Sequence, residues 1–556
     1  MMRTKRWIFL SFVLIAAMLL PLFGCASGSG SLIRYNISQG VDNLDPQFAE
    51  DPNELLIILN CFEGLFRLDE EGVPVPAAAE SYTLSEDERT YTFSLYRDLT
   101  WSDETPLTAH DFVFAFQRLL QPDSPAPCAS DFLCIRNAEK VLEGTLPPSA
   151  LGVKAQDDHT LIIRLEEPNL FFTELLTSAA AMPCREDFFY GCNGRYGLSL
   201  DTLLFNGPYK VRSWNNNKYI GLTANETYHL QDALPACSVY LYTTQPAEIN
   251  AEMLLTDRID SGPVRFEDLK TLENASYTMD SFRNTVYLLF FNLRNPYLQN
   301  EDVRLGMAYA FNRQLFQPQL SENLELTNVL IPPIASIQGE NYRSLTSVSG
   351  LVYDKEDAQR HFADGLEQLG ILKLSKNNLI CLENGPHKVL AGYIQQQWQN
   401  DLNLYVNTEA LSSAEFYSAV SSGDFQMAIV PLTMSQSNPG IFLSQISRYL
   451  TLFAPQVIEP DPNAEKAEEL TDAFLRASAI AEDLKLLQNY CTYAQSATTR
   501  EEAAMWFAQA EKLLLESGYA VPLYFESSYY ATSPAFSGIR FTPYAGHIYF
   551  RDTVEK

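Results

Sequence analysis

The chain has 556 residues, more than one compact domain usually holds, so two or three lobes with separate cores are expected. A composition of 46% hydrophobic and 12% aromatic residues is that of a globular protein and excludes a largely disordered chain. The net charge of −30 repels phosphate backbones and anionic lipid headgroups, so binding to nucleic acid or directly to lipid is not expected.

The N-terminus has the pattern of an export signal. Three basic residues precede an apolar run at 7–20, and LFGC follows at 22–25. This segment resembles a bacterial lipobox, although its phenylalanine is bulkier than usual, with Cys25 as the lipidated first residue of the mature protein. We therefore predict a signal peptide at 1–24 and a flexible tether at 25–31.

An uncleaved membrane anchor is the alternative, but the apolar stretch is short for a spanning helix. Both interpretations place the body outside the cytoplasmic membrane. Removal of the signal takes away Arg3, Lys5 and Arg6 and no acidic residue, which changes the net charge from −30 to −33.

Strand and helix patterns alternate along the whole body. In chain order they predict strand 32–38, helix 53–66 ending at Gly64, strand 91–96, helix 107–120 capped by Thr108 and Asp111, strands 161–165, 206–214 and 285–293, helices 303–316, 357–370 and 393–402, strand 425–430, helices 464–493 and 501–517, and strand 521–532. This mixture indicates an α/β protein of more than one lobe.

Eight cysteines lie outside the lipobox, and an exported chain can form disulfides. The spacings Cys128/Cys134 and Cys184/Cys192 permit small loops, so buried thiols and one or two structural bridges both stay open. The sequence has no CxxC motif and no Cys/His cluster with zinc spacing, and its six histidines are scattered. No metal or cofactor is therefore expected.

Several segments share their order with one known family. The most specific is WSDETPLTAHDF at 101–112, which departs from the family pattern only at Glu104, where glycine is usual. The others are CFEGLFRLDEEGVPVPAAAESY at 61–82, NGPYKVRSW at 206–214, FFNLRNPYLQNEDVRLGMAYAFNR at 290–313 and AEKLLLESGYAVPLYF at 510–525. Together they resemble family 5 of the extracytoplasmic solute-binding proteins, the oligopeptide-binding class of ABC importers.

The resemblance implies an α/β fold of the periplasmic-binding-protein type II kind, with two main lobes, a hinge and an additional small domain. We expect a first lobe from 32–76, 203–295 and 521–556, an additional lobe at 77–202, and a second ligand-binding lobe at 296–520. Most of the matching residues, such as Trp101, Pro106 and Phe112, are expected to be structural.

The resemblance also implies a monomer that is not an enzyme. It would capture oligopeptides or related solutes in the cleft between its lobes and deliver them to an ABC permease and ATPase complex, while the lipid on Cys25 holds it to the membrane. Ligand contacts to both lobes would favour the closed form.

In peptide binders of this class, a Trp-x-x-Asp segment follows the strand that corresponds to 425–430 and binds the ligand's free amine. With Pro439 setting the register, Leu432 takes the tryptophan position and Ser435 the aspartate position, so this amine anchor is missing. Glu50 matches an acidic cleft position, and Cys128 stands where an aromatic cleft residue is common. The candidate ligand-binding residues are Glu50, Cys128, Leu432, Ser435 and Asn438.

Three interpretations follow from the missing anchor. The cleft binds peptides whose amine is satisfied elsewhere, for example by Glu50 or Asp42. It binds a different solute, such as a blocked peptide or a sugar. Or transport is lost, and the protein is a lipid-anchored sensor or interaction protein. An exported hydrolase is disfavoured because neither GxSxG nor HExxH occurs in the chain.

Overall fold

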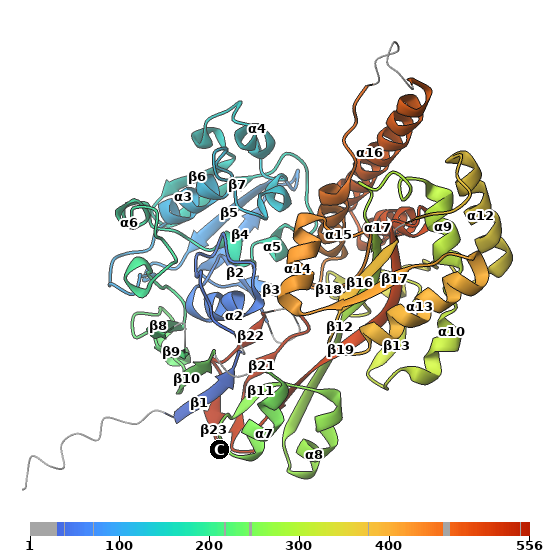
Figure 1. Ribbon diagram of the computed structural model, residues 1–556. Helices are drawn as coiled ribbons and strands as arrows, with labels where there is room; N and C mark the ends of the chain where they lie inside the picture. Colours follow the sequence, from blue (N-terminus) through green and yellow to red (C-terminus); the bar gives the residue numbers. More distant parts are fainter. Residues whose placement is uncertain are drawn as a thin grey trace, which may run out of the picture.

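The computed structural model of the protein describes residues 31–37, 39–69, 72–215, 218–243, 247–375, 377–459, 467–544 and 546–556. The predicted signal peptide, Cys25 and all but the last residue of the predicted tether lie outside these ranges. Figure 1 shows two bodies of mixed helices and strands, joined by long strands that run between them.

In the described part of the chain, one sheet of eleven strands runs through both bodies. Ten of its strands follow the order β17 (Asn407–Leu411), β16 (Asn378–Leu382), β18 (Met427–Thr433), β12 (Thr278–Phe291), β19 (Ala520–Thr532), β11 (Ser261–Val264), β1 (Ser31–Asn36), β10 (Cys237–Tyr242), β9 (Tyr219–Ala224) and β8 (Tyr209–Asn215), and β13 (Leu324–Leu326) pairs with β19. The strands predicted at both ends of the chain and at 285–293 and 425–430 therefore belong to one sheet.

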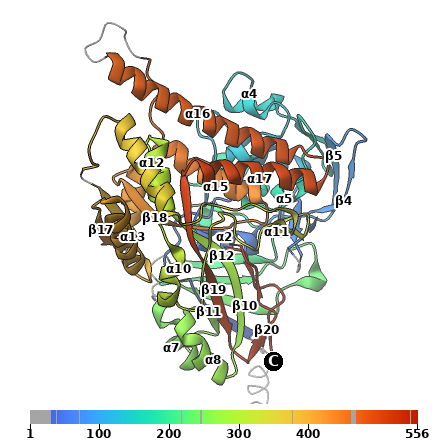
Figure 2. The ribbon, with the colours of Figure 1, turned by 90° about the vertical axis from the view of Figure 1, so that its right-hand side faces the viewer.

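Helices pack around the strands of both lobes. The longer ones are α2 (Pro52–Cys61), α3 (Ala109–Leu119), α9 (Glu301–Tyr309), α12 (Lys355–Gln368), α13 (His387–Leu402), α14 (Ser413–Ser422), α15 (Pro439–Phe453), α16 (Ala467–Gln495) and α17 (Arg500–Glu516). Figure 2 shows α16 projecting beyond the body above α17. Within the described ranges, every helix is too short or too polar to cross a bilayer.

Two separate hydrophobic cores confirm the two-lobed α/β fold. One core is built mainly from residues 33–241 with 536–550, and the other mainly from 286–525. The strands β12 and β19 enter both cores: Val286–Phe291 and Ala520–Phe525 belong to the second, whereas Phe282 and Tyr530 pack against the first. Each of these two strands therefore passes from one lobe to the other.

A second sheet lies in the first lobe, with the order β4 (Ala79–Leu84), β5 (Thr90–Leu95), β7 (Thr160–Arg164) and β6 (Val153–Asp157). Helix α3 packs on it, begins at the predicted capping box of Thr108 and Asp111, and buries Phe112 completely. Trp101 is also buried, so these signature residues have the structural role expected of them. The finer division of the chain at 76, 202, 295 and 520 stays a prediction.

Helix α2 ends earlier than the sequence pattern indicates. It stops at Cys61, because the amide of Gly207 donates to the Cys61 carbonyl at 2.9 Å and no longer side chain fits there. The next residues are extended, and the Asn206 side chain both accepts from the Glu63 amide at 3.1 Å and donates to the Glu63 carbonyl at 2.7 Å. Gly64 consequently lies beyond the helix, in the approach to β2 (Phe66–Leu68).

The cysteines in the described part of the chain are unpaired thiols. All eight that the structure describes are free, including Cys128, Cys134, Cys184 and Cys192, so the bridges that the spacings permitted are absent from the described chain. Burial raises the pKa of the Cys134 thiol to about 12 and that of Cys184 to about 11, which keeps both protonated and unreactive.

A buried ion pair fixes the segment that leads to Glu50. The guanidinium of Arg118 on α3 pairs with Asp45 and donates to the Gln47 side chain at 2.7 Å, and it lies 4.7 Å from the ring of Phe189. Both charged side chains are less than a tenth exposed. This pair ties residues 45–50 to α3 and so determines where Glu50 can lie.

We expect Arg118→Ala to destabilise the protein by about 3–5 kcal/mol, because it leaves Asp45 buried without its partner. Urea unfolding of the mature protein measures this as a lower midpoint. Arg360→Ala, which removes only an exposed pair with Asp357, should leave the midpoint unchanged. Equal midpoints for the two variants would contradict a structural role for Arg118.

Candidate functional site

A series of polar and aromatic side chains from both lobes lies close together, from Glu50 to the hinge. At one end lie Glu50, which is exposed, and Cys128, which is half-buried. Burial and the neighbouring Asp131 raise the pKa of Cys128 to about 12; Glu50 contributes in the same direction and Arg448 in the opposite one. Arg448 belongs to α15 of the second lobe and lines a groove together with Asp131, so charged groups of both lobes lie near the Cys128 thiol.

Tyrosines continue this series toward the hinge. Tyr449 on α15 packs against Phe290, with ring centroids 5.8 Å apart. Burial raises the pKa of Tyr449, and the nearby Tyr417 hydroxyl raises it further; Tyr417 also contributes to the raised pKa of Tyr287. Tyr417, on α14, therefore lies between Tyr449 and the hinge strand β12, and almost half of its surface is exposed.

The floor of the cleft is formed where β12 and β19 pass between the lobes. Tyr287 pairs with Tyr524 and Thr285 with Glu526, which puts all four side chains on one face of the two strands. The Tyr287 ring stacks on His387 and Tyr524 with centroids 4.5 and 4.6 Å away. Burial lowers the pKa of His387 to about 4, so a neutral imidazole shares a 2.6 Å hydrogen bond with the Tyr524 hydroxyl.

Glu526 is the charged group of this floor. Its carboxylate accepts a hydrogen bond from the Tyr287 hydroxyl, and burial raises its pKa above the usual value for glutamate. It lines a cavity of about 800 Å³, a size that suits a short peptide or another small ligand. Residues 263–267, which begin at the end of β11, and residues 321, 323–324 and 384–386 also line this cavity, which therefore lies beside the hinge strands.

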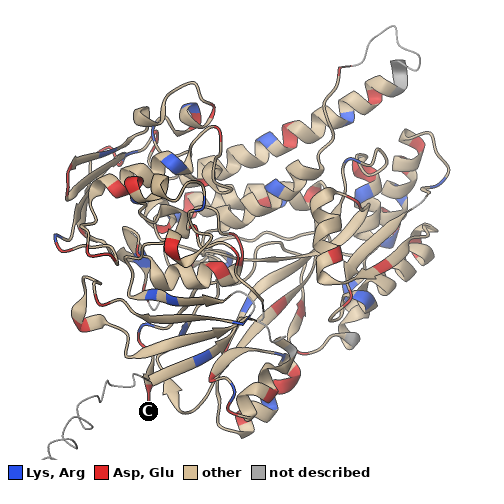
Figure 3. Ribbon diagram, turned by 60° about the vertical axis from the view of Figure 1, so that its left-hand side comes forward, with Lys and Arg blue, Asp and Glu red and all other residues tan. Residues whose placement is uncertain are grey.

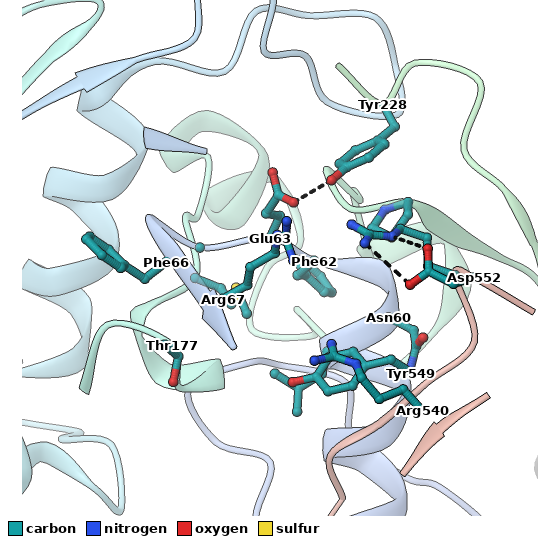
Figure 4. A pocket seen from close by; sticks show the side chains of 15 residues that line it. Asn60, Phe62, Glu63, Phe66, Arg67, Thr177, Tyr228, Arg540, Tyr549 and Asp552 are labelled. Atoms are coloured by element: carbon teal, nitrogen blue, oxygen red, sulfur yellow. Dashed lines mark hydrogen bonds and ion pairs between the residues drawn. The ribbon is translucent and has the colours of Figure 1, made fainter. Parts of the chain in front are cut away.

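A second groove, of about 780 Å³, separates the first lobe from α15 and α16. It carries Asp131, Glu139, Glu166 and Glu167 from the first lobe and Arg448 from the second. By contrast, the pocket of Figure 4, within the first lobe, holds only about 50 Å³. There the Glu63 carboxylate accepts a hydrogen bond from the Tyr228 hydroxyl at 2.5 Å and contacts the His229 ring at 2.7 Å. These contacts are structural, because the pocket is too small to hold a solute.

The two lobes also touch directly. Glu174, on the short helix α5 (Phe172–Leu175), accepts hydrogen bonds on one carboxylate oxygen from the Ser437 hydroxyl and, at 3.0 Å, from the Asn438 amide. Beside it, the Leu170 amide donates to the Gln495 carbonyl at 2.9 Å. Burial raises the pKa of Glu174 to about 7. A carboxylate of the first lobe is thus enclosed by the loop that precedes α15.

Comparison with known proteins identifies this architecture. The family model described as bacterial extracellular solute-binding proteins, family 5 Middle, matches residues 73–449, well over half of the chain. The chain belongs to this family. It is 24% identical to the dipeptide-binding protein of Lactococcus lactis over 97% of both chains, and 24% identical to the oligopeptide-binding protein OppA of Bacillus subtilis over 99% of this chain and 100% of that one.

The solved structures agree on the fold of this family 5 protein. Listeria monocytogenes OppA bound to peptide superposes with a TM-score of 0.75 at 22% identity, covering 95% of this chain and 99% of that one. The predicted family and fold class are therefore confirmed. In the part of the chain that the structure describes, no group of His, Cys, Asp and Glu side chains is placed to hold a metal ion.

The structure separates the candidate residues into two sets. Glu50 and Cys128 lie together at the cleft, and their contact with ligand stays a prediction. Leu432 is 5% exposed and pairs with Val286 in the core of the second lobe, so its side chain packs inward. Ser435 accepts from the Gln445 side chain at 3.3 Å, and Asn438 caps α15 by accepting from the Gly440 amide at 2.7 Å. The segment 432–438 is thus held by its own lobe and by Glu174.

The sequence reasoning missed four residues of this site: Tyr287, Tyr417, Tyr449 and Glu526. It also missed Glu174. The sequence contains one sign of Glu526: this charged residue directly follows the apolar run VPLYF inside a predicted strand. Glu174 left none, because its partners lie more than 260 positions away along the chain.

Glu174→Gln should change how stability depends on pH. The folded-state pKa of about 7 exceeds the ordinary 4.5, so the favourable contribution of protonated Glu174 is complete below pH 4.5 and is lost as pH rises through 7. At pH 8 the variant should therefore be more stable, by at most about 3 kcal/mol, because a glutamine oxygen still accepts both hydrogen bonds.

Melting temperatures of the variant and the wild type between pH 4 and pH 8 measure this difference. The curves should converge at low pH and separate above neutrality. Glu143→Gln, at an exposed position of the same lobe, should follow the wild type at every pH. If the curve for Glu174→Gln runs parallel to that of the wild type at every pH, ionisation of this carboxylate does not destabilise the folded protein.

Proposed function

We propose that this protein captures short peptides in the cleft between its lobes and delivers them to the permease and ATPase of an ABC importer. A lipid on Cys25 holds it, as a monomer, at the outer face of the cytoplasmic membrane. It performs no chemistry on its ligand; its work is binding and release.

The observation that carries this proposal is the cavity of about 800 Å³ beside the two hinge strands, which Thr285 of β12 and Glu526 of β19 both line. Tyrosines on α14 and α15 lie near this hinge, since Tyr417 contributes to the raised pKa of both Tyr287 and Tyr449. Two relatives matched over nearly their whole length are named for dipeptide and oligopeptide binding, which supports peptides as the ligand class.

Closure follows from the same geometry. A ligand that touches both lobes binds the closed arrangement better than the open one, and it shifts the population by that difference in affinity. The contact of Glu174 with Ser437 and Asn438 joins the lobes through the protein's own residues, so it would contribute to the closed arrangement in addition to the ligand. The closed form then presents both lobes together to the permease.

One observation favours a second candidate. The amine anchor expected at Ser435 is absent, and Leu432 is in the core, which suits a neutral solute such as a sugar or a blocked peptide. The two candidates differ in the ligand and share the cleft.

Thermal unfolding of the mature protein separates them. A randomised tetrapeptide mixture should raise the melting temperature, because a ligand at 100 times its Kd stabilises the folded state by about 2.7 kcal/mol. A panel of mono- and disaccharides should not. Stabilisation by saccharides alone would favour the second candidate, and no stabilisation by either would favour a sensor without transport. Cleavage of the tetrapeptides during the incubation would refute a pure binding function.

A further inference from the structure

We propose that Glu526 is the carboxylate that binds the free amino terminus of the ligand, in a subsite on the hinge strand β19. Glu526 pairs with Thr285 of β12, which in turn pairs with Thr433, so one strand separates it from the segment at 432–438. This inference rests on the proposed function, since it assumes that the ligand is a peptide with a free amine. It assigns the charge that the family pattern places at Ser435 to a different structural element.

Among the described residues, no cation pairs with Glu526. Its carboxylate accepts a hydrogen bond from the Tyr287 hydroxyl, and burial raises its pKa. The Tyr287 ring is held in place by His387 and Tyr524, so the donor cannot turn away. Glu526 is half-buried, and a carboxylate that has lost part of its contact with water is stabilised by an opposite charge, which a peptide ammonium supplies.

The adjoining cavity has the same electrostatic character. Two carboxylates line it, those of Glu267 and Glu526, and its one guanidinium, that of Arg265, is already paired. Arg265 contacts Glu267 at 3.1 Å and Asp268 at 2.9 Å. The other polar groups of the cavity are uncharged, so a positive charge on the ligand would be attracted to Glu526.

The backbone beside Glu526 suits a peptide. On the outer edge of β19, β13 pairs as far as Glu526 and β11 begins at Tyr529. Between them, no described strand pairs with Ser527 and Ser528 on that edge, and both residues line the cavity. An extended peptide whose amine lies at Glu526 would meet these backbone groups as an added strand segment does.

The other carboxylates near the cleft are less suited to this role. Glu174 is enclosed between the lobes and already accepts two hydrogen bonds on one oxygen. Glu50 and Asp42 are exposed, where water screens a charge pair and reduces its contribution. Glu526 combines partial burial, a cavity and a fixed hydroxyl donor.

The test changes the carboxylate of the protein and the amine of the ligand, separately and together, and compares the resulting affinities. Apparent affinities of the wild type, Glu526→Gln and Glu526→Asp are measured by calorimetry for the randomised tetrapeptide mixture and for the same mixture acetylated at its amino termini. Glu325→Gln is the matched control. Glu325 pairs with Phe525, the neighbour of Glu526 in β19, so it lies on the opposite face, where it contacts Arg283.

The wild type should prefer free over acetylated peptides by about 30-fold or more, the cost of removing one partner of an enclosed charge pair. Glu526→Gln should bind both mixtures alike, to within about threefold. Glu526→Asp, which keeps the charge one methylene further back, should retain part of the preference, and Glu325→Gln all of it. If Glu526→Gln unfolds, the aspartate variant still decides, because it retains a carboxylate at the same backbone position.

Three results would overturn the proposal, and they differ in what they leave standing. If Glu526→Gln keeps the full preference, another carboxylate binds the amine, and Glu50→Gln would reveal whether it is Glu50. If the wild type binds free and acetylated peptides equally, peptide capture stands but the amine subsite does not. If the wild type binds neither mixture, the proposed function fails, and the subsite with it.

Discussion

The antiparallel pairing of β12 with β19 holds the two cores in register. Both strands change character at the same level: β12 is half-exposed before Asn284 and buried after it, and β19 is buried up to Phe525 and half-exposed from Glu526. The two strands change from buried to half-exposed at the same level because Thr285 pairs with Glu526. The polar halves of both strands therefore face the space between the cores. At that level there is no apolar core to enter, and polar side chains remain accessible to a ligand. The position of the cleft thus follows from where two apolar runs end.

The parts of the fold that rest on local patterns could be predicted. TVYLLFFNL and VPLYF are apolar runs of strand length, and the amphipathic segments at 357–370 and 501–517 became α12 and α17 with small shifts. The end of α2 could not be predicted, because it depends on Gly207, which lies far along the chain and takes the Cys61 carbonyl. The helix expected at 303–316 likewise divides into α9 and α10 (Arg313–Phe316), where the Asn312 side chain starts a new helix by accepting from Leu315.

The candidate site was harder to predict because its members meet only in three dimensions. Glu50 and Cys128 were found through the family resemblance, and the fold does bring them together opposite Arg448. The same resemblance directed attention to Leu432 and Ser435, yet in this chain Ser437 and Asn438 of that loop bind Glu174. An aspartate at 435 would add a negative charge two positions from Ser437, which contacts this buried carboxylate, and like charges near each other are disfavoured. The absent aspartate and the buried Glu174 are therefore consistent with each other: the loop serves contact between the lobes.

The overall charge of the protein fits a cationic group on its ligand. Figure 3 shows Asp and Glu positions along helices, strands and loops of both lobes, in agreement with the net charge of −30. A negative field of this kind raises the concentration of cationic solutes near the surface but cannot select among them, because salt screens it within about 10 Å. Selection needs a charge that is partly shielded from water and held at a fixed place. Glu526 meets this requirement because it is half-buried, lines a cavity and lies on a hinge strand that is common to both lobes.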